Sequence, residues 1–339
     1  MQIRDVSKRF GSHQVLEGIS FDIPRGAVTN IMGPSGTGKS VLLKNIIGLL
    51  KPEEGSIWID GQDLVQLSDR ELYKVRMKMG VLFQDGALFG SMNLFDNIAF
   101  PMREHTKRTE KDIHDTVMEK ADLVGLVAHL RKFPGEISGG MKKRAGLARA
   151  LVLEPEIVLF DEPDSGLDPV RVAYLDDLIL KTKAETNATF VVITHNIEST
   201  TRVADYMAIL FRSRLAAFGS RPELFASDDP VVRQFLHGET HGPIGMDELA
   251  DAEEEIERTL QQAQAEQAER EYALAGVGAA GAAGAAGMGP DVQSAAADEI
   301  PDPWAARDTQ QVPVVVPPAA SAPNPPVPPT PPQPPAPPW

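Results

Sequence analysis

Residues 33–40 read GPSGTGKS, a glycine-rich stretch that ends in a lysine and a serine. It meets every fixed position of the pattern G-x-x-x-x-G-K-[ST], after the apolar run 27–32 and before a helical pattern over 41–50. Glycines let backbone N–H groups approach phosphate oxygens, and a helix N-terminus adds partial positive charge. We expect Lys39 to reach the β- and γ-phosphates of a nucleotide and Ser40 to ligate Mg²⁺. The predicted phosphate-binding residues are Gly33, Pro34, Ser35, Gly36, Thr37, Gly38, Lys39, Ser40 and Val41.

Two adjacent carboxylates follow a later apolar run. Residues 157–160 read IVLF and are followed by Asp161 and Glu162. Because successive side chains of a strand point in opposite directions, Asp161 can hold Mg²⁺ through water while Glu162 polarises an attacking water. Acidic residues often close strands, so the pair becomes specific only together with the phosphate-binding loop about 120 residues earlier.

Two further polar side chains come directly after short apolar runs. His195 follows FVVIT and can reach a γ-phosphate from that position, and Gln84 follows VLF and can reach Mg²⁺ or the attacking water. The predicted catalytic residues are therefore Lys39, Gln84, Glu162 and His195, and the predicted metal ligands are Ser40, Gln84 and Asp161.

A second candidate anion site lies about a hundred residues after the first. Residues 136–151 read EISGGMKKRAGLARAL, in which a hydroxyl and two glycines precede a basic helical pattern. The Ser138 hydroxyl, the Gly140 N–H and the dipole of the following helix can together hold an anion. One small domain thus carries two phosphate sites, while the first site alone leaves kinases, GTPases and motor proteins open.

Strands and helices must alternate to position these residues. The runs 27–32, 157–160 and 190–194 are apolar and rich in β-branched residues, which is typical of strands covered on both faces. Helical patterns over 111–124 and 170–185 separate them. The pattern predicts an α/β fold of the P-loop NTPase class with a parallel sheet.

Composition changes sharply near residue 240. Residues 240–339 hold 15 of the 48 acidic residues but only three of the 33 basic ones, so the formal net charge of -15 belongs mostly to this part. We expect a catalytic domain over 1–240, an acidic helical extension over 241–275 and a disordered Gly/Ala- and Pro-rich tail over 276–339. The charge balance argues against a nucleic-acid partner.

Cysteine and membrane signals are absent from the sequence. The chain has no cysteine, which excludes disulfides and thiolate metal sites and fits a cytosolic protein. It has no apolar stretch of about 18 residues, so we expect that it does not span a membrane by itself.

The ordered motifs resemble those of ATP-binding-cassette (ABC) ATPases, whose signature loop usually reads LSGGQ. Beside the phosphate-binding loop the sequence has a Q-loop glutamine (Gln84), VLFDEP over 158–163, a D-loop over 165–168 and a switch histidine (His195). The signature loop corresponds to Ser138, Gly139 and Gly140. Phe10 stands where the family stacks the adenine. The resemblance covers roughly residues 1–237 and includes a helical signature subdomain at about 86–155.

This resemblance implies that two copies meet head to tail around two ATP molecules with Mg²⁺. The signature loop and Asp168 of one copy would close on the nucleotide held by the phosphate-binding loop of the other, which gives a homodimer with two equivalent sites. Met141 replaces the usual glutamine, and Asp164 and Gly166 replace the commoner Thr/Ser and Ala. None of these changes removes an essential catalytic group, so we still expect ATP hydrolysis.

Longer stretches resemble the ATPases of Mce- and Mla-type lipid transporters, and most of all the actinobacterial Mce members. The stretches are 81–106, 133–153, 160–171 and 230–238. The resemblance implies integral-membrane permease partners, Mce substrate-binding proteins beyond them, a lipid or other hydrophobic cargo, and import. It also implies a location at the cytoplasmic face of the cell membrane, held there through the permease.

Several alternatives remain open from the sequence. The ATPase of an importer for small polar solutes such as amino acids would share all the catalytic motifs. A non-transport ABC ATPase usually has two cassettes or long coiled-coil insertions, and this chain has neither. A regulator with a degenerate site would not need Lys39, Asp161, Glu162 and His195. The apolar residues of 86–102 fit either core packing or a groove for a permease helix.

Overall fold

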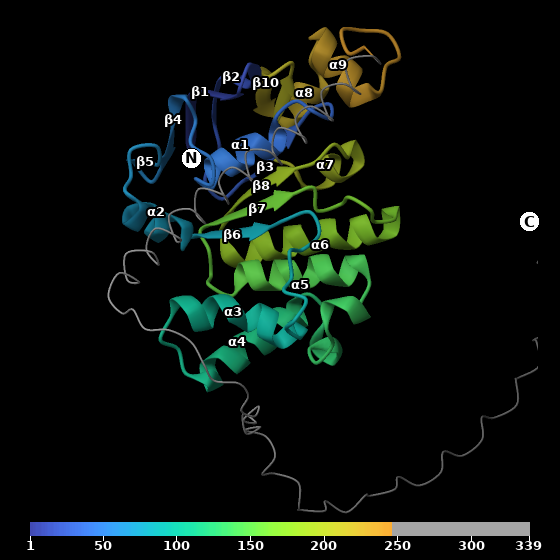
Figure 1. Cartoon of the computed structure of the whole chain (residues 1–339). Coiled ribbons are helices and arrows are strands. Elements are labelled where there is room, and N and C mark those ends of the chain that lie inside the picture. The colour runs from blue at the N-terminus through green and yellow to red at the C-terminus, as the bar shows by residue number, and fades with distance from the viewer. Residues whose placement is uncertain (246–339) are drawn as a thin grey trace, which may run out of the picture. The chain divides into compact units, whose positions relative to one another are not determined.

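The structure, a computed structural model, describes residues 1–245. In this part of the chain, six strands form the larger of two sheets (Figure 1). Their order is β10-β9-β3-β8-β7-β6. The strands are β3 (Val28–Met32), β6 (Met79–Leu82), β7 (Ile157–Asp161), β8 (Thr189–Ile193), β9 (Tyr206–Phe211) and β10 (Arg214–Ser220). All neighbouring pairs are parallel except β9 and β10. The predicted parallel sheet is confirmed, and β3 and β8 are buried throughout.

A smaller antiparallel sheet was not predicted. Its order is β2-β1-β4-β5, and its strands are β1 (Gln2–Phe10), β2 (His13–Asp22), β4 (Glu54–Ile59) and β5 (Gln62–Asp63). Register shifts interrupt the pairing of β1 with both β2 and β4, and Asp5 has a positive φ of 49°. These irregularities break the alternation of apolar and polar residues by which such a sheet is recognised.

Helix α1 (Lys39–Ile46) packs between the two sheets, because it contacts β2 on one side and β7 and β8 on the other. The predicted helix 41–50 differs from α1 at both ends. Lys39 and Ser40 already belong to the first turn, and the helix ends before Gly48, whose φ of 74° no helical residue adopts. The other helices beside the sheets are α2 (Asp69–Arg76), α6 (Pro169–Thr186), α7 (Ile197–Val203), α8 (Arg221–Phe225) and α9 (Pro230–His237).

Three helices form a layer beside β6, as the resemblance implied for 86–155 (Figure 1). They are α3 (Leu94–His105), α4 (Glu110–Leu123) and α5 (Gly139–Leu151), with 3₁₀ turns at Val127–His129 and Pro134–Glu136. Helix α5 contacts β6, and α3 and α4 pack on α5. The predicted helices 111–124 and 170–185 correspond to α4 and α6 within one residue at each end.

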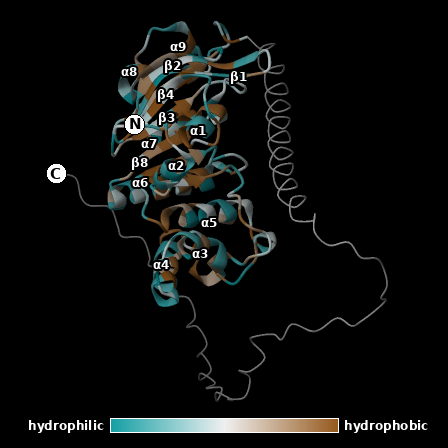
Figure 2. Cartoon of the chain, turned by 60° about the vertical axis from the view of Figure 1, so that its left-hand side comes forward, coloured by the Kyte–Doolittle hydropathy of each residue, from teal (hydrophilic) through white to brown (hydrophobic). Residues whose placement is uncertain are grey.

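The predicted acidic helix and the Gly/Ala- and Pro-rich tail lie outside the described residues, except for 241–245. Within the described part, hydrophobic residues concentrate on the strands and on the helix faces that pack against them (Figure 2). No helix of residues 1–245 has the length and apolar character needed to cross a membrane.

The largest buried side chains join the sheet to the helical layer. Phe160 on β7 is fully buried, stacks with Phe190 at 5.9 Å between ring centroids, and shares one hydrophobic cluster with residues of α3, α4 and α5. We expect Phe160→Ala to lower the free energy of unfolding by about 3–5 kcal/mol, because it leaves a cavity in this cluster. Urea denaturation measures the loss. Phe89→Ala, at a 43% exposed ring, is the control and should cost much less; equal losses would contradict the packing argument.

Candidate active site

The phosphate-binding loop folds tightly between β3 and α1. A Cβ atom added to Gly33 would lie 2.2 Å from the carbonyl oxygen of Leu210, and one added to Gly38 would lie 2.6 Å from that of Val15. Both glycines also have positive φ angles, 146° and 89°. The Lys39 ammonium group donates to the carbonyl oxygens of Gly33 (3.0 Å) and Pro34 (2.8 Å), so the loop curls around its own lysine. The loop thus has the cradle shape that the sequence predicted.

Ser40 and Asp161 lie side by side, as expected for two metal ligands. The Ser40 hydroxyl donates to Oδ1 of Asp161 over 3.1 Å. Burial raises the pKa of Asp161, and the hydrogen bond from Ser40 opposes that shift. A hydroxyl and a half-buried carboxylate are oxygen ligands of the kind Mg²⁺ prefers, so these residues fit the ion. Gln84, the third predicted ligand, instead donates from Nε2 to the Ser165 hydroxyl over 3.3 Å.

Glu162 does not continue the strand alternation that the sequence suggested. Strand β7 ends at Asp161, and Glu162 has a left-handed φ of 46°. Its backbone N–H donates to the carbonyl oxygen of Ile193 at the end of β8, which fixes this turn. A non-glycine residue in this conformation stores backbone strain and is found preferentially at functional sites. The strained turn, rather than strand alternation, therefore separates the directions of the two carboxylates.

His195 and Glu162 stabilise each other's charged forms. Nδ1 of His195 lies 3.7 Å from Oε1 of Glu162. This proximity raises the pKa of His195 above its usual 6.5 and lowers the pKa of Glu162 below its usual 4.5. Between pH 4.5 and pH 6.5 both side chains are therefore charged, and the ion pair is fully formed. Its contribution is lost as pH rises through the raised pKa of His195, and also as pH falls through the lowered pKa of Glu162.

We expect the ring of His195 in the nucleotide-free protein to titrate above pH 6.5, and Glu162→Gln to lower its midpoint. Removal of the carboxylate removes the main interaction that favours the imidazolium. NMR titration of the histidine ring signals measures both midpoints, and the other histidines serve as internal controls. An unchanged His195 midpoint in the variant would contradict the pairing.

The signature loop leads into α5, with Ser138 as the N-cap. The Ser138 hydroxyl oxygen accepts a hydrogen bond from the backbone N–H of Met141 over 3.4 Å. Ser138 and Gly139 are exposed, and a Cβ atom added to Gly139 would meet nothing within 4 Å. The side chain of Met141 packs on the cluster that contains Phe160. The loop therefore presents its hydroxyl and the start of α5 to solvent, while Met141 takes part in core packing.

The D-loop and the preceding Asp164 form hydrogen bonds with Thr194, which follows β8, with α5 and with the start of α6. Asp164 is buried and accepts from the Thr194 hydroxyl at 3.0 Å, and Asp168 caps α6 by accepting from two backbone N–H groups at 3.1 Å. The ammonium group of Lys143, on α5, donates to the carbonyl oxygens of Ser165 and of Glu162, the latter at 3.4 Å. Lys143 and Thr194 were not among the predicted site residues, because their contacts join segments that the sequence alone does not place together.

Phe10 ends β1, where the ammonium group of Lys8 lies 5.4 Å from its ring centroid. The ring is only partly buried, against the cluster that includes residues of α1.

The structure thus brings together five predicted site residues, which are Lys39, Ser40, Asp161, Glu162 and His195. The charge of Lys39 influences the pKa of Asp161, Glu162 and His195. Gln84 lies at the D-loop of the same site, and Ser138 lies at the start of a separate helix.

A glycine-rich loop between a parallel strand and a helix, with acidic residues ending a neighbouring strand, defines a P-loop nucleotide hydrolase. The family model described as ABC transporter matches residues 16–165. The probable ribonucleotide transport ATP-binding protein mkl of Mycobacterium leprae is 59% identical over 251 residues, which are 74% of this chain and 72% of that protein. The chain therefore belongs to the ABC transporter family, as the ATP-hydrolysing subunit of a transporter.

Other similar proteins extend this comparison. The intermembrane phospholipid transport system ATP-binding protein MlaF of Escherichia coli K12 is 44% identical over 244 residues, 72% of this chain and 91% of MlaF. Among solved structures, cbiO1 from Clostridium perfringens has a TM-score of 0.62 at 30% identity and covers 67% of this chain and 91% of its own. The dimeric cassette MJ0796 bound to ADP and Pi has a TM-score of 0.60 at 29% identity, with coverage of 65% and 97%.

Proposed function

We propose that the chain hydrolyses ATP at a site in which each residue has its own role. Lys39 and the loop 33–41 bind the phosphates, Glu162 polarises the attacking water, and His195 contacts the γ-phosphate. Ser40 and Asp161 would hold Mg²⁺, with Gln84 reaching the ion or the water once nucleotide is bound. Bound Mg²⁺ neutralises charge on the phosphates. The clustering of Lys39, Asp161, Glu162 and His195 supports this assignment.

A second copy of the chain completes each site. Ser138, Gly139, Gly140 and Asp168 of one copy would contact the nucleotide bound to the other, and Phe10 would stack on its adenine. The exposure of Ser138 and Gly139 at the start of α5 supports this role, because an anion-binding surface must be open before its ligand arrives. The similar cassette MJ0796 is described as dimeric in a post-hydrolysis state with ADP and Pi.

We propose that a permease helix docks in a groove of about 470 Å³ beside the Q-loop, the Phe89 groove. Its apolar walls include Phe89, Phe100 and Pro101 from the segment 86–102, and Tyr73 and Arg149 lie at its sides. The rings of Phe89 and Phe100 are 4.8 Å apart, and Phe89 is 43% exposed. Leu94, Ile98, Ala99 and Met102 of the same segment are fully buried in the core, so core packing accounts for them. The exposed ring of Phe89 supports docking at the groove alone.

The cargo that we propose is a lipid or another hydrophobic molecule, imported through a permease with Mce substrate-binding proteins. The observation that carries this proposal is the similarity to the phospholipid transport protein MlaF over 91% of its length. The ATPase would lie at the cytoplasmic face of the membrane, attached through the permease. The domain would end near residue 240, with the acidic and Pro-rich segments following it.

An importer of polar solutes is the second candidate. It is favoured by the mycobacterial relatives, which are named as probable ribonucleotide transport proteins and are 58–59% identical to this chain. These relatives share 72% of their length with the chain, against 91% for MlaF. The catalytic residues are common to both candidates, so only the permease and its cargo distinguish them.

A pull-down of the tagged full chain from detergent-solubilised membranes tests the proposal, with mass spectrometry of the bound proteins. We expect an Mce-type permease together with Mce substrate-binding proteins. Recovery of a permease for nucleotides or amino acids would favour the second candidate, and recovery of ribosomes or DNA would contradict both.

A matched pair of variants tests the docking groove. Phe89→Asp places a charge in the apolar groove and should abolish recovery of the permease. Tyr174→Asp makes the same kind of change at a 71% exposed ring on α6, outside the groove, and should leave recovery intact. Equal recovery with both variants would contradict docking at the Phe89 groove.

A further inference from the structure

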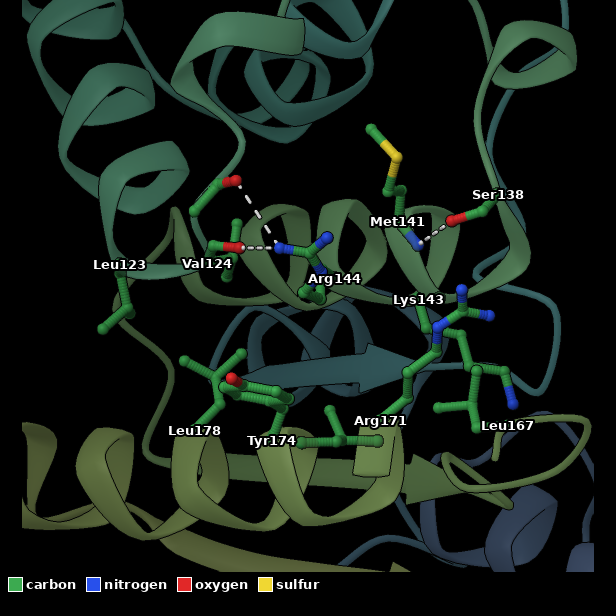
Figure 3. A pocket seen from close by; sticks show the side chains of 13 residues that line it. Leu123, Val124, Ser138, Met141, Lys143, Arg144, Leu167, Arg171, Tyr174 and Leu178 are labelled. Atoms are coloured by element: carbon green, nitrogen blue, oxygen red, sulfur yellow. Dashed lines mark hydrogen bonds between the residues drawn. The ribbon is translucent and has the colours of Figure 1, made fainter. Parts of the chain in front are cut away.

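A cavity of about 400 Å³ opens between α5 and α6, and we call it the α5–α6 cavity (Figure 3). Leu123 at the end of α4 and Tyr174 and Leu178 on α6 form apolar walls, and none of residues 33–40 lines it. Its rim reaches Ser138 of the signature loop. A volume of this size falls within the range of about 300–1,000 Å³ that is usual for small-molecule sites.

Three cations line the α5–α6 cavity, and among residues 1–245 no Asp or Glu does so. Nη1 of Arg144 donates to the carbonyl oxygen of Val124 over 2.8 Å, and Figure 3 shows the guanidinium beside Val124, which follows α4. The ammonium group of Lys143 also donates to backbone carbonyl oxygens. Arg171 pairs with Asp168 at the start of its own helix, over 3.2 Å. The charges of Lys143 and Arg144 thus have carbonyl acceptors but no carboxylate within ion-pair distance in the described residues.

The surroundings disfavour the charged forms of Lys143 and Arg144. Burial lowers the pKa of Lys143, although Asp164, Asp85 and Glu162 act in the opposite direction. Burial also lowers the pKa of Arg144, and the neighbouring Arg171 lowers it further. An anion in the cavity would offset both effects, because an opposite charge stabilises the charged form of each group.

The apolar walls of the cavity favour a ligand that is partly apolar as well as charged. Tyr174 is 71% exposed on the surface of α6, and Leu123 and Leu178 continue the apolar lining beside it. A ligand that covers these side chains must carry an apolar chain as well as an anionic head.

We propose that the α5–α6 cavity binds a single-chain anionic amphiphile, such as a long-chain carboxylate, with its head at Arg144 and its chain along Tyr174 and Leu178. None of residues 33–40 lines the cavity, but it shares Ser138 and Gly140 with the surface proposed above to contact the nucleotide of a second copy. The proposal does not depend on the identity of the transported cargo.

Isothermal titration of the full chain with oleate, below its micelle concentration and without nucleotide, tests the proposal. We expect saturable binding at one site, and at least about tenfold weaker binding of oleyl alcohol, which lacks the charge, and of acetate, which has the carboxylate but lacks the chain. Arg144→Gln should weaken oleate binding by at least about tenfold. Arg149→Gln is the matched control, because Arg149 lies on the same helix and also donates to two backbone carbonyl oxygens but lies outside the cavity.

Equal oleate affinities of the wild-type protein and Arg144→Gln would overturn the proposal, as would acetate binding as tight as that of oleate. Tyr174→Glu provides a second variant that does not endanger the fold, because this side chain is largely exposed. It places a carboxylate at the cavity wall and should weaken oleate binding as well. Retained binding in this variant would also contradict the proposal.

Discussion

Glu162→Gln is expected to lower the rate of ATP hydrolysis by at least about a hundredfold and to trap an ATP-bound dimer. The amide keeps the size of the side chain but cannot polarise water as a carboxylate does. Lys39, Ser40 and Asp161 remain, so nucleotide binding persists. Phosphate release measures hydrolysis, and light scattering of the variant with MgATP measures the mass of the complex.

Glu156→Gln is the control for this variant. Glu156 precedes the same strand at its opposite end and forms surface ion pairs with Arg25 and Lys78. We expect a near wild-type rate and no trapped dimer. A Glu162→Gln protein that remained monomeric with MgATP, or that still hydrolysed ATP at the wild-type rate, would contradict the role assigned to Glu162.

Ser138→Arg is expected to abolish hydrolysis while the isolated chain still binds nucleotide. The arginine removes the hydroxyl and fills the space that the γ-phosphate of the opposite copy would enter. Ser138 is the N-cap of α5, and its side chain forms the capping contact with Met141, so the phosphate-binding loop of the same chain keeps its structure. Phosphate release measures hydrolysis, and equilibrium binding of a fluorescent ATP analogue measures nucleotide affinity.

Loss of the helix cap is a separate effect of this change and costs about 1 kcal/mol of stability. Ser68→Arg controls for it, because Ser68 is the exposed N-cap of α2 and forms a capping box with Glu71. That variant should lose similar stability but keep its activity. Unchanged hydrolysis in Ser138→Arg would refute a site shared between two copies.

The sequence predicts that Lys39, Asp161 and His195 lie close together, and the structure places them so, although their catalytic roles stay predictions. Each functional residue follows an apolar run, and the carboxyl ends of parallel strands meet at one edge of a sheet, so the spacing alone places Lys39 near Asp161 and His195. The strained turn at Glu162 was not predictable, because it depends on a hydrogen bond to the end of the neighbouring strand β8.

Features that depend on tertiary contacts were missed. The bonds from Gln84 and Lys143 to Ser165 of the D-loop join segments that are up to 81 residues apart in the chain. The antiparallel sheet was missed because bulges in β1 disrupt its alternation. The start of α1 was misplaced because glycine at position 38, in a left-handed conformation, serves as the N-cap in place of a hydroxyl residue.

Mixing two inactive variants tests whether each nucleotide site is built from two copies of the chain. Lys39→Ala damages the phosphate-binding loop and Ser138→Arg damages the signature loop, so each homodimer has two defective sites. A mixed dimer instead has one site with both defects and one site with none. We expect an equimolar mixture to recover hydrolysis at about a quarter of the wild-type rate, because half of the dimers are mixed and each has one intact site. A mixture as inactive as its components would contradict the shared-site account.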